Sequence, residues 1–547
     1  MQDEDVAEPV TRLVAGYGAQ ARAVREVIAA LTDRSWTLAG LVAATAVPRR
    51  TVEEVLDALG DDLGDAMTIR PERRAAYRAR FGYDQLRRTA LPDPLAAQLD
   101  DAVTLRAELA RLVAEAPAAR RALDHVAATP ETVAWRGLWL DSRYDLAGAH
   151  LLCVGDHDLT SLAATLVNPE LTVTVVDLDE RILEFIDVEA RRLGLAVRCR
   201  YADLRHGLPV GAAGSADLVF TDPPYTPEGV RLFLARGAEG LRDRERGRLV
   251  MAYGFSDRTP ALGLKVQQSV QELALACEAI LPAVNRYAGA QAVGSASDLY
   301  VLQPTARTWK ALDRAIESAV NIYTHGPQSL EGRGARLAPD VAAAVLDAPV
   351  TAMVGSGWPA DSAPVRVKLD TVLAGGLPPA ASVRGAVAVA LDLSADPGPW
   401  LLRALLATNA DRLALLVPNS HPDVASEASQ RALAGLVAAK YALRFRRSTP
   451  GSEHAVVVAE ALPPAGLEPP DRLVRGLLDR AHGRIGNVWR EGLVAAGRRA
   501  GTPLTKNEAR AAVRAASARP ELLDAALVEL PRHQVAAVLA EVAASGL

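Results

Sequence analysis

The feature that most constrains the fold of this chain is an alternation of strand-like and helix-like segments between residues 146 and 312. Strand-like runs occupy residues 150–155, 172–177, 197–203 and 216–222, and segments with helical periodicity lie among them. Parallel strands need long crossover connections, which helices normally supply. The pattern therefore predicts an α/β fold with a doubly wound, Rossmann-like parallel sheet.

The rest of the chain is long enough for several more domains, because 547 residues exceed what one hydrophobic core supports. Residues 1–90 show three helical blocks and a possible β-wing, which predicts a winged-helix-like domain, and residues 91–145 predict a helical connector. Residues 340–462 repeat the strand and helix alternation without a Gly-rich turn, so we expect a structural or degenerate second α/β domain. Residues 472–547 are predicted to be helical throughout.

The charge balance argues against nucleic acid as a partner. The chain has 61 Lys plus Arg against 66 Asp plus Glu, a net charge of -5, and thus no basic surplus for a phosphate backbone. The candidate recognition helix of the winged-helix-like segment carries Glu53, Glu54 and Asp57. These carboxylates would repel phosphates, so an interaction or oligomerisation module is favoured, and we expect a homo-oligomer.

Cysteine usage and the start of the chain indicate the compartment. Cys153, Cys199 and Cys277 are isolated in apolar or strand-like sequence without a C-x-x-C pair, so we expect reduced, buried residues. The first ten residues lack the basic and apolar regions of an export signal, and no run of about 18 apolar residues occurs. We therefore expect a cytoplasmic protein that does not bind membranes.

Acidic residues cluster where the predicted strands end. Ligands of doubly wound sheets bind beyond the carboxyl ends of the strands, so these loops predict the site. The candidates are Gly155, Asp156, His157 and Asp158 after the first strand, Asp177 and Asp179 after the second, Asp203 after the third, and Asp222, Pro223, Pro224 and Tyr225 after the fourth.

The loops after the first three strands predict a donor that contains a nucleoside but no phosphate. Asp177, at the end of the second strand, is placed to accept hydrogen bonds from ribose hydroxyls, although it could instead cap the next helix. Asp179 could contribute to the same site or take the capping role, and Asp203 is placed to meet the adenine edge. Gly155 lets the backbone approach the donor closely. The first loop lacks the G-x-G-x-x-G motif, which argues against NAD and FAD as cofactors. An adenosyl sulfonium donor fits better.

The nucleophile is predicted to be an amine. An alkyl amine has a pKa of about 10 and must lose a proton before it attacks. Asp158 and Asp222 can accept that proton and hold neighbouring ammonium groups, and His157 is either a base or a neighbour of the base. Pro223 and Pro224 stiffen the fourth loop, although Asp-Pro-Pro can also be a simple strand exit. No second His or Cys stands at ligand spacing, so no metal is predicted.

The three acidic loops resemble those of the branched-chain polyamine synthases, also called bis(aminopropyl)spermidine synthases. That family carries Gly-Asp-Asp-Asp-Leu-Thr-Ser, Asp-x-Asp-Glu and Asp-Pro-Pro, and the resemblance runs from about residue 129 to 305. It implies transfer of an aminopropyl group from decarboxylated S-adenosylmethionine to an amine of a polyamine such as spermidine, a step of polyamine biosynthesis. It also implies that Asp158 lies near the attacking nitrogen.

Two residues differ from the family pattern and leave the acceptor open. His157 stands at the middle aspartate, Tyr225 stands where Glu is usual, and the thiol-pair segment of the family is missing. Asp-Pro-Pro-Tyr is also typical of amino-methyltransferases, which use S-adenosylmethionine itself. That activity is the alternative prediction, and a non-catalytic regulatory or interaction protein is the third.

Overall fold

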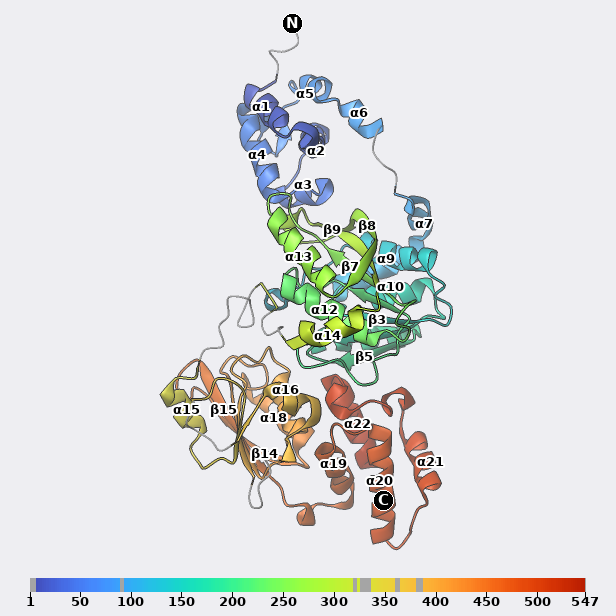
Figure 1. Cartoon of the computed structure of the whole chain (residues 1–547), viewed down its shortest axis with the longest axis vertical. Coiled ribbons are helices and arrows are strands. Elements are labelled where there is room, and N and C mark those ends of the chain that lie inside the picture. The colour runs from blue at the N-terminus through green and yellow to red at the C-terminus, as the bar shows by residue number, and fades with distance from the viewer. Residues whose placement is uncertain are drawn as a thin grey trace. The chain divides into compact units, whose positions relative to one another are not determined.

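The computed structural model describes two compact units within the chain (Figure 1). Unit 1 comprises residues 1–173, 190–197 and 216–326, and unit 2 comprises residues 174–189, 198–215 and 327–547. The described residues are 6–88, 93–317, 322–324, 336–359, 365–379 and 387–546.

A seven-stranded sheet confirms the predicted doubly wound α/β core. Its strand order is β5-β4-β3-β6-β7-β9-β8; β3, β6 and β7 pair in parallel, and β9 is antiparallel to both of its neighbours. The chain order reverses between β3 and β6, so the loops after these two strands leave adjacent parallel strands. The strands are β3 (His150–Val154), β4 (Thr172–Asp177), β5 (Val197–Tyr201), β6 (Leu218–Thr221), β7 (Arg248–Tyr253), β8 (Leu275–Arg286) and β9 (Ala296–Pro304).

Helices connect these strands as the sequence pattern predicted. Two of them begin at a side-chain cap: Thr129 and Thr226 accept hydrogen bonds from backbone N–H groups of the helices they precede. The helices in this part of the chain are α7 (Ala96–Asp101), α8 (Val103–Glu115), α9 (Pro130–Arg143), α10 (Thr160–Val167), α11 (Glu180–Leu193), α12 (Pro227–Gly240), α13 (Pro260–Glu272) and α14 (Thr308–Glu317).

The prediction for Cys277 was wrong. Helix α13 ends at Glu272, and Cys277 lies in strand β8 with an exposed side chain rather than a buried one. Strand β8 is the last strand of the sheet order, so part of its surface lacks a covering layer. Cys153 and Cys199 are buried, as predicted.

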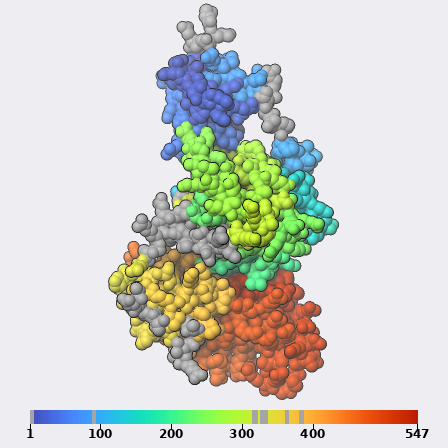
Figure 2. All heavy atoms as spheres, viewed as in Figure 1, coloured from blue at the N-terminus to red at the C-terminus, as the bar shows by residue number. Residues whose placement is uncertain are grey.

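Residues 6–88 form a small helical module with its own hydrophobic core. Its atoms are the blue spheres in Figure 2. Its three predicted helical blocks appear as α2 (Ala21–Asp33), α3 (Leu38–Thr45) and α4 (Arg49–Leu59), and a short antiparallel hairpin joins β1 (Leu63–Gly64) to β2 (Thr68–Ile69). This order matches the predicted one, while membership of the winged-helix class stays a prediction. The remaining helices are α1 (Glu8–Gly16), α5 (Arg74–Phe81) and α6 (Tyr83–Arg88).

Helix α4 contacts another part of unit 1. The Arg258 guanidinium donates to the hydroxyl oxygen of Thr51 at 3.0 Å and pairs with the Glu54 carboxylate. Arg49 of the same helix donates to the side chain of Gln291 at 3.1 Å. The acidic residues that argued against DNA recognition therefore include one that forms an ion pair within the protein.

A second sheet in unit 2 follows the same plan with one edge strand fewer. Its order is β11-β10-β12-β13-β15-β14, with β10 to β13 parallel and β15 antiparallel to both of its neighbours. Removing the edge strand β5 from the first sheet and renumbering gives this same order. The strands are β10 (Ala352–Val354), β11 (Arg366–Val367), β12 (Ala388–Asp392), β13 (Arg412–Pro418), β14 (Tyr441–Arg446) and β15 (His454–Ala461).

The second sheet has a Gly-rich turn, which corrects the expectation that it lacked one. Gly355 and Gly357 follow strand β10, and Gly355 has a positive φ of 104°. A Cβ on Gly357 would lie 2.3 Å from Oδ2 of Asp392, at the end of neighbouring strand β12. Strand β10 has only three residues, too few for its periodicity to stand out.

Helices make up the rest of unit 2, as predicted for the C-terminal region. No helix in the described ranges is long and apolar enough to cross a membrane. The helices are α15 (Pro339–Val345), α16 (Leu369–Gly375), α17 (Trp400–Ala407), α18 (Glu427–Val437), α19 (Pro469–Asp479), α20 (Ile485–Arg499), α21 (Lys506–Ala516) and α22 (Arg532–Ala544).

We predict that Gly137→Ala destabilises unit 1. Helix α9 approaches α10 so closely at Gly137 that a Cβ would lie 2.9 Å from the carbonyl oxygen of Ala163. Overpacking of this kind costs about 1–3 kcal/mol, which thermal or urea unfolding would detect. The control is Gly16→Ala, where no heavy atom lies within 4 Å of the new Cβ. Equal stability of Gly137→Ala and wild type would contradict the prediction.

Candidate active site

The loop after β3 places Asp156 and Asp158 differently. Asp156 accepts hydrogen bonds from the backbone N–H groups of Thr160 at 2.8 Å and Ser161 at 3.1 Å, at the start of α10. Burial raises the pKa of Asp156 to about 7, against the lowering effect of these bonds. Asp156 therefore caps a helix in unit 1, and its contact with a donor stays a prediction. Gly155 has a positive φ of 71°, which only glycine adopts readily.

Asp158 is buried, and both of its carboxylate oxygens are hydrogen-bonded. Oδ1 accepts from the backbone N–H of Ala128 at 2.9 Å, and Oδ2 accepts from Nη1 of Arg136 at 2.9 Å. The side chain of Asp158 is 7% exposed. These contacts fix the carboxylate in one position.

Asp222 lies at the end of the neighbouring strand and shares the same arginine. Its Oδ2 accepts from Nη2 of Arg136 at 2.7 Å and from the hydroxyl of Tyr287 at 2.7 Å. Its Oδ1 accepts a longer hydrogen bond from the Tyr225 hydroxyl, at 3.2 Å. Asp222 is the more exposed carboxylate of the two, with 16% of its side chain exposed against 7% for Asp158.

Arg136 joins the two carboxylates and was missed from the sequence. It lies on α9 with a fully buried side chain, and its Nε also donates to Oδ1 of Asn285 at 2.8 Å. A buried guanidinium needs charged or hydrogen-bonding partners, and here it has both. The available signal was an arginine between Trp135 and Trp139, in the predicted helical connector.

Burial and nearby charges shift the pKa values of the two aspartates in opposite directions. Burial opposes ionisation of Asp158, but the charge of Arg136 and hydrogen bonds outweigh it, so the pKa of Asp158 is lowered. Burial and the charge of Asp158 raise the pKa of Asp222, with Arg136 only partly opposing the rise. The pair behaves as one ionised carboxylate beside one that can hold a proton.

Two tyrosines complete the polar cluster around Asp222. The Tyr287 hydroxyl lies 2.7 Å from Oγ of Ser297 and 3.2 Å from the Tyr225 hydroxyl. Burial raises the pKa of both tyrosines well above the ordinary value, so they remain protonated donors. Asn285 and Ser297 belong to strands β8 and β9, and Tyr287 directly follows β8; β8 was not predicted, so this side of the site was not foreseen.

The Asp-Pro-Pro-Tyr segment forms a short rigid connection from β6 to α12. Pro223 and Pro224 lie between the strand and the cap residue Thr226, whose side chain accepts a hydrogen bond from the first turn of α12. The ring of Tyr225 packs edge-on against Tyr253, with centroids 5.1 Å apart and planes at 62°. Tyr225 is therefore oriented by both its ring and its hydroxyl.

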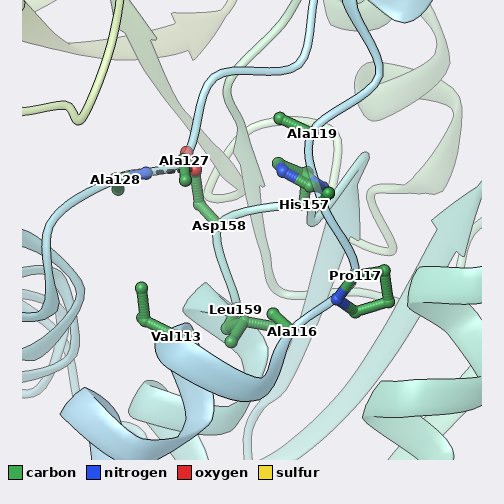
Figure 3. Close-up of a pocket in the computed structure, with 10 residues that line it drawn as sticks. Val113, Ala116, Pro117, Ala119, Ala127, Ala128, His157, Asp158 and Leu159 are labelled. Carbon is green, nitrogen blue, oxygen red and sulfur yellow. Dashed lines mark hydrogen bonds between the residues drawn. The ribbon is translucent and has the colours of Figure 1, made fainter.

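His157 and Asp158 line a cavity of about 100 Å³. Figure 3 shows both side chains leaving the loop after β3, with the hydrogen bond from Ala128 to Asp158 drawn. The ring of His157 stacks on His125, with centroids 4.4 Å apart. Most of the remaining lining is apolar: Val113, Ala116, Pro117, Ala118, Ala119, Ala127, Ala128 and Leu159.

Three of the predicted donor-binding carboxylates, Asp177, Asp179 and Asp203, belong to unit 2. Asp179 accepts the backbone N–H of Arg181 at 3.1 Å and pairs with its guanidinium at 2.6 Å, so Asp179 takes the capping role at α11. Asp177 accepts the backbone N–H of Asp179 at 2.7 Å, and its backbone carbonyl accepts from Ala202 at 3.1 Å. Asp203 is engaged by Arg205. Their roles toward a donor stay predictions.

The fold and the acidic strand ends define a Rossmann-like α/β domain with a candidate site at the carboxyl ends of its strands. Within the described ranges, no group of three or more His, Cys, Asp and Glu is placed to hold a metal ion. Residues 105–314 match the family model described as the branched-chain polyamine synthase A C-terminal domain. This segment, less than half of the chain, is similar to the C-terminal domain of that family.

Similar proteins with curated names match only part of their own length. The N(4)-bis(aminopropyl)spermidine synthase of Thermococcus kodakarensis is 33% identical over 146 residues, which cover 26% of this chain and 42% of that protein. The synthase of the same name from Thermus thermophilus is 37% identical over 127 residues, 23% of this chain and 37% of that one. An uncharacterized protein of Methanocaldococcus jannaschii is 36% identical over 174 residues, 32% and 43% of the two chains. The chain thus spans about two fifths of the length of these relatives.

Solved structures match with low scores. The branched-chain polyamine synthase of Thermus thermophilus, in complex with N4-aminopropylspermidine and 5'-methylthioadenosine, has a TM-score of 0.39 at 20% identity. It covers 55% of this chain and 93% of that one. A putative RNA methyltransferase of Pyrococcus horikoshii has a TM-score of 0.29 at 13% identity and covers 37% and 99% of the two chains.

We predict that Arg136→Met destabilises the protein by about 3–5 kcal/mol, because it leaves two buried carboxylates without their cation. In the variant, the pKa values of Asp158 and Asp222 lie above their unfolded values of about 4, so the native state binds more protons than the unfolded state. Its stability therefore falls as the pH rises. Thermal unfolding at about pH 5 and pH 8 measures this deficit.

The control for this prediction is Arg136→Lys. Lysine keeps the charge but is a point donor that cannot reproduce the forked contacts to both aspartates, so we expect an intermediate loss. A deficit of Arg136→Met that is the same at both pH values would contradict the ionic role of Arg136.

Proposed function

We propose that this protein is an aminopropyltransferase that moves an aminopropyl group from decarboxylated S-adenosylmethionine to an amine of a polyamine. The observation that supports this most strongly is the pair of Asp158 and Asp222 at adjacent strand ends, held by Arg136. The pair lies within the segment that matches the polyamine synthase family model, and three similar proteins carry the name of a bis(aminopropyl)spermidine synthase.

In the proposed reaction, an amine nitrogen attacks the carbon bonded to the sulfonium sulfur. A carbon–nitrogen bond forms, the carbon–sulfur bond breaks, and methylthioadenosine leaves with the electron pair of that bond. The amine must give up one proton, and Asp222 is the group that accepts it. Asp222 suits this role because its pKa is raised, its side chain is more exposed than that of Asp158, and its Oδ1 accepts a long hydrogen bond from the Tyr225 hydroxyl.

Asp158 has a different role in this proposal. It remains ionised and keeps Arg136 and the backbone of Ala128 in place. Its negative charge raises the pKa of Asp222 and so makes Asp222 a stronger base. The sequence prediction treated the two aspartates alike, whereas their contacts favour one anchor and one base.

The alternative is methyl transfer from S-adenosylmethionine to an amine. The observation that favours it is Tyr225, which gives the motif Asp-Pro-Pro-Tyr and lies against Asp222 and Tyr253. The two activities differ in the donor, because only the methyl donor carries a carboxylate.

We predict that the protein binds decarboxylated S-adenosylmethionine more tightly than S-adenosylmethionine. Calorimetric titration with each donor, with and without spermidine, measures the preference, and mass spectrometry of the product identifies the transferred group. Tighter binding of the carboxylated donor together with a methylated product would establish the alternative instead.

We predict that Asp222→Asn lowers kcat by about 10²–10⁴-fold, the usual contribution of a general base. The variant should keep its fold, since the amide preserves shape and still accepts from Arg136. The matched control is Asp100→Asn, at a side chain that is 83% exposed and 3.9 Å from its ion-pair partner. Wild-type turnover in Asp222→Asn would remove Asp222 from the mechanism.

We predict an acid limb in the pH profile of kcat/KM. Asp222 accepts a proton only when ionised, so activity falls as the pH drops through its pKa. Since burial and Asp158 raise this pKa, the midpoint should lie above the ordinary carboxyl value of about 4. Steady-state rates across the pH range measure the midpoint, and a limb at the ordinary value would contradict the raised pKa.

A further inference from the structure

Helix α17 contacts two loops at which the donor is expected to bind. The helix starts at Trp400 and all eight of its residues are buried in the domain that contains the second sheet. Trp400 and Arg403, one turn apart, therefore lie on the same face of the helix. Their partners are Asp203, which follows β5, and Glu180, which begins α11; all four residues belong to unit 2.

Trp400 holds the loop after β5. Its indole N–H donates to Oδ2 of Asp203 at 3.0 Å, and the guanidinium of Arg205 donates to both oxygens of the same carboxylate, at 2.9 and 2.5 Å. The Arg205 guanidinium lies over the Trp400 ring, 5.1 Å from its centroid. Asp203 is 5% exposed, so these contacts fix the conformation of the loop where the adenine edge is expected.

Arg403 holds the loop after β4. Its Nη2 pairs with Oε1 of Glu180 at 2.5 Å and donates to the carbonyl of Leu530 at 2.8 Å. The guanidinium also lies 4.0 Å from the ring centroid of Tyr201, the last residue of β5. Glu180 comes directly after Asp177 to Asp179, where the ribose contact is expected. One residue of α17 thus contacts both strand ends.

The burial of the Arg403 guanidinium lowers the stability of the domain. Among the described residues, its buried Nε and Nη1 have no hydrogen-bond partner, and the residue is 2% exposed. A buried guanidinium with unsatisfied N–H groups destabilises a domain relative to an apolar side chain of similar size. A positioning role for this cation accounts for its presence better than stability does.

The geometry points to α17 as a positioning element for the donor. We propose that Trp400 and Arg403 hold the loops after β4 and β5 in the conformation that binds the adenosyl group. The domain built on the second sheet would then serve donor binding without binding a donor itself. This inference rests on the proposed function, because it requires an adenosyl donor.

The test uses the full chain and two variants. Trp400→Phe keeps the aromatic ring and removes the N–H group, and Arg403→Met keeps the length and removes the charge. The control is Arg412→Met, which breaks the ion pair of Arg412 with Asp347 on the same domain, 2.6 Å apart. Within the described part of the chain, no hydrogen bond or ion pair joins Arg412 to either loop. The probes are 5'-methylthioadenosine in calorimetry and hydrogen exchange of peptides that span residues 177–180 and 201–206.

We expect each variant, but not the control, to bind 5'-methylthioadenosine about tenfold more weakly, as loss of one hydrogen bond to a charged group would produce. Exchange in the two loops should become faster, and KM should rise for the donor and not for the acceptor. If Arg403→Met does not fold, Trp400→Phe alone decides, since it removes one N–H group.

Two results separate the inference from the function on which it rests. Wild-type affinity in Trp400→Phe and Arg403→Met, with or without faster exchange, overturns the role of α17 and leaves the proposed function standing. Failure of the wild-type protein to bind either 5'-methylthioadenosine or decarboxylated S-adenosylmethionine overturns the proposed function itself.

Discussion

The polar centre of unit 1 depends on the buried ion cluster of Arg136, Asp158 and Asp222. Two buried carboxylates at adjacent strand ends would repel one another, and the guanidinium removes that conflict with one hydrogen bond to each. Its third contact, to Asn285, ties the cluster to strand β8. Helix α9, strands β3 and β6 and the β8–β9 hairpin therefore all meet at this one side chain. Gly137, the next residue, allows the close approach of α9 and α10 beside it.

The two sheets share a strand order but differ in the residues at their strand ends. Both have the same strand order, apart from one edge strand, and both end in an antiparallel pair. In the first sheet, the loops after adjacent parallel strands carry Asp158 and Asp222. In the second, the glycine turn after β10 is closed against Asp392, which accepts hydrogen bonds from the N–H and hydroxyl of Ser394. The equivalent strand ends of the second sheet are thus engaged with each other, consistent with a supporting domain.

The sequence predicted the parts of the site that follow clearly apolar strands. Strands β3, β4 and β6 are largely buried, mostly apolar segments, so the acidic residues after them could be assigned to loops. Arg136 was missed because the residues around it show the pattern of a packing helix. Tyr287 and Ser297 were missed because β8 alternates irregularly, with register shifts in its pairing with β9. The capping roles of Asp156 and Asp179 depend on backbone N–H directions, which a sequence does not display.

The charge of the cluster bears on the acceptor. With both aspartates ionised, the cluster carries one net negative charge, because Arg136 neutralises the other; with Asp222 protonated, it carries none. His157 stands where the family pattern has a further aspartate, so the loop contributes less negative charge than the pattern implies. A polyamine carries several ammonium groups, and this cluster alone would balance at most one of them. For the proposed polyamine acceptor, hydrogen bonding and shape would then have to supply most of the binding, and the alanine residues that line the cavity beside His157 would suit an alkyl chain.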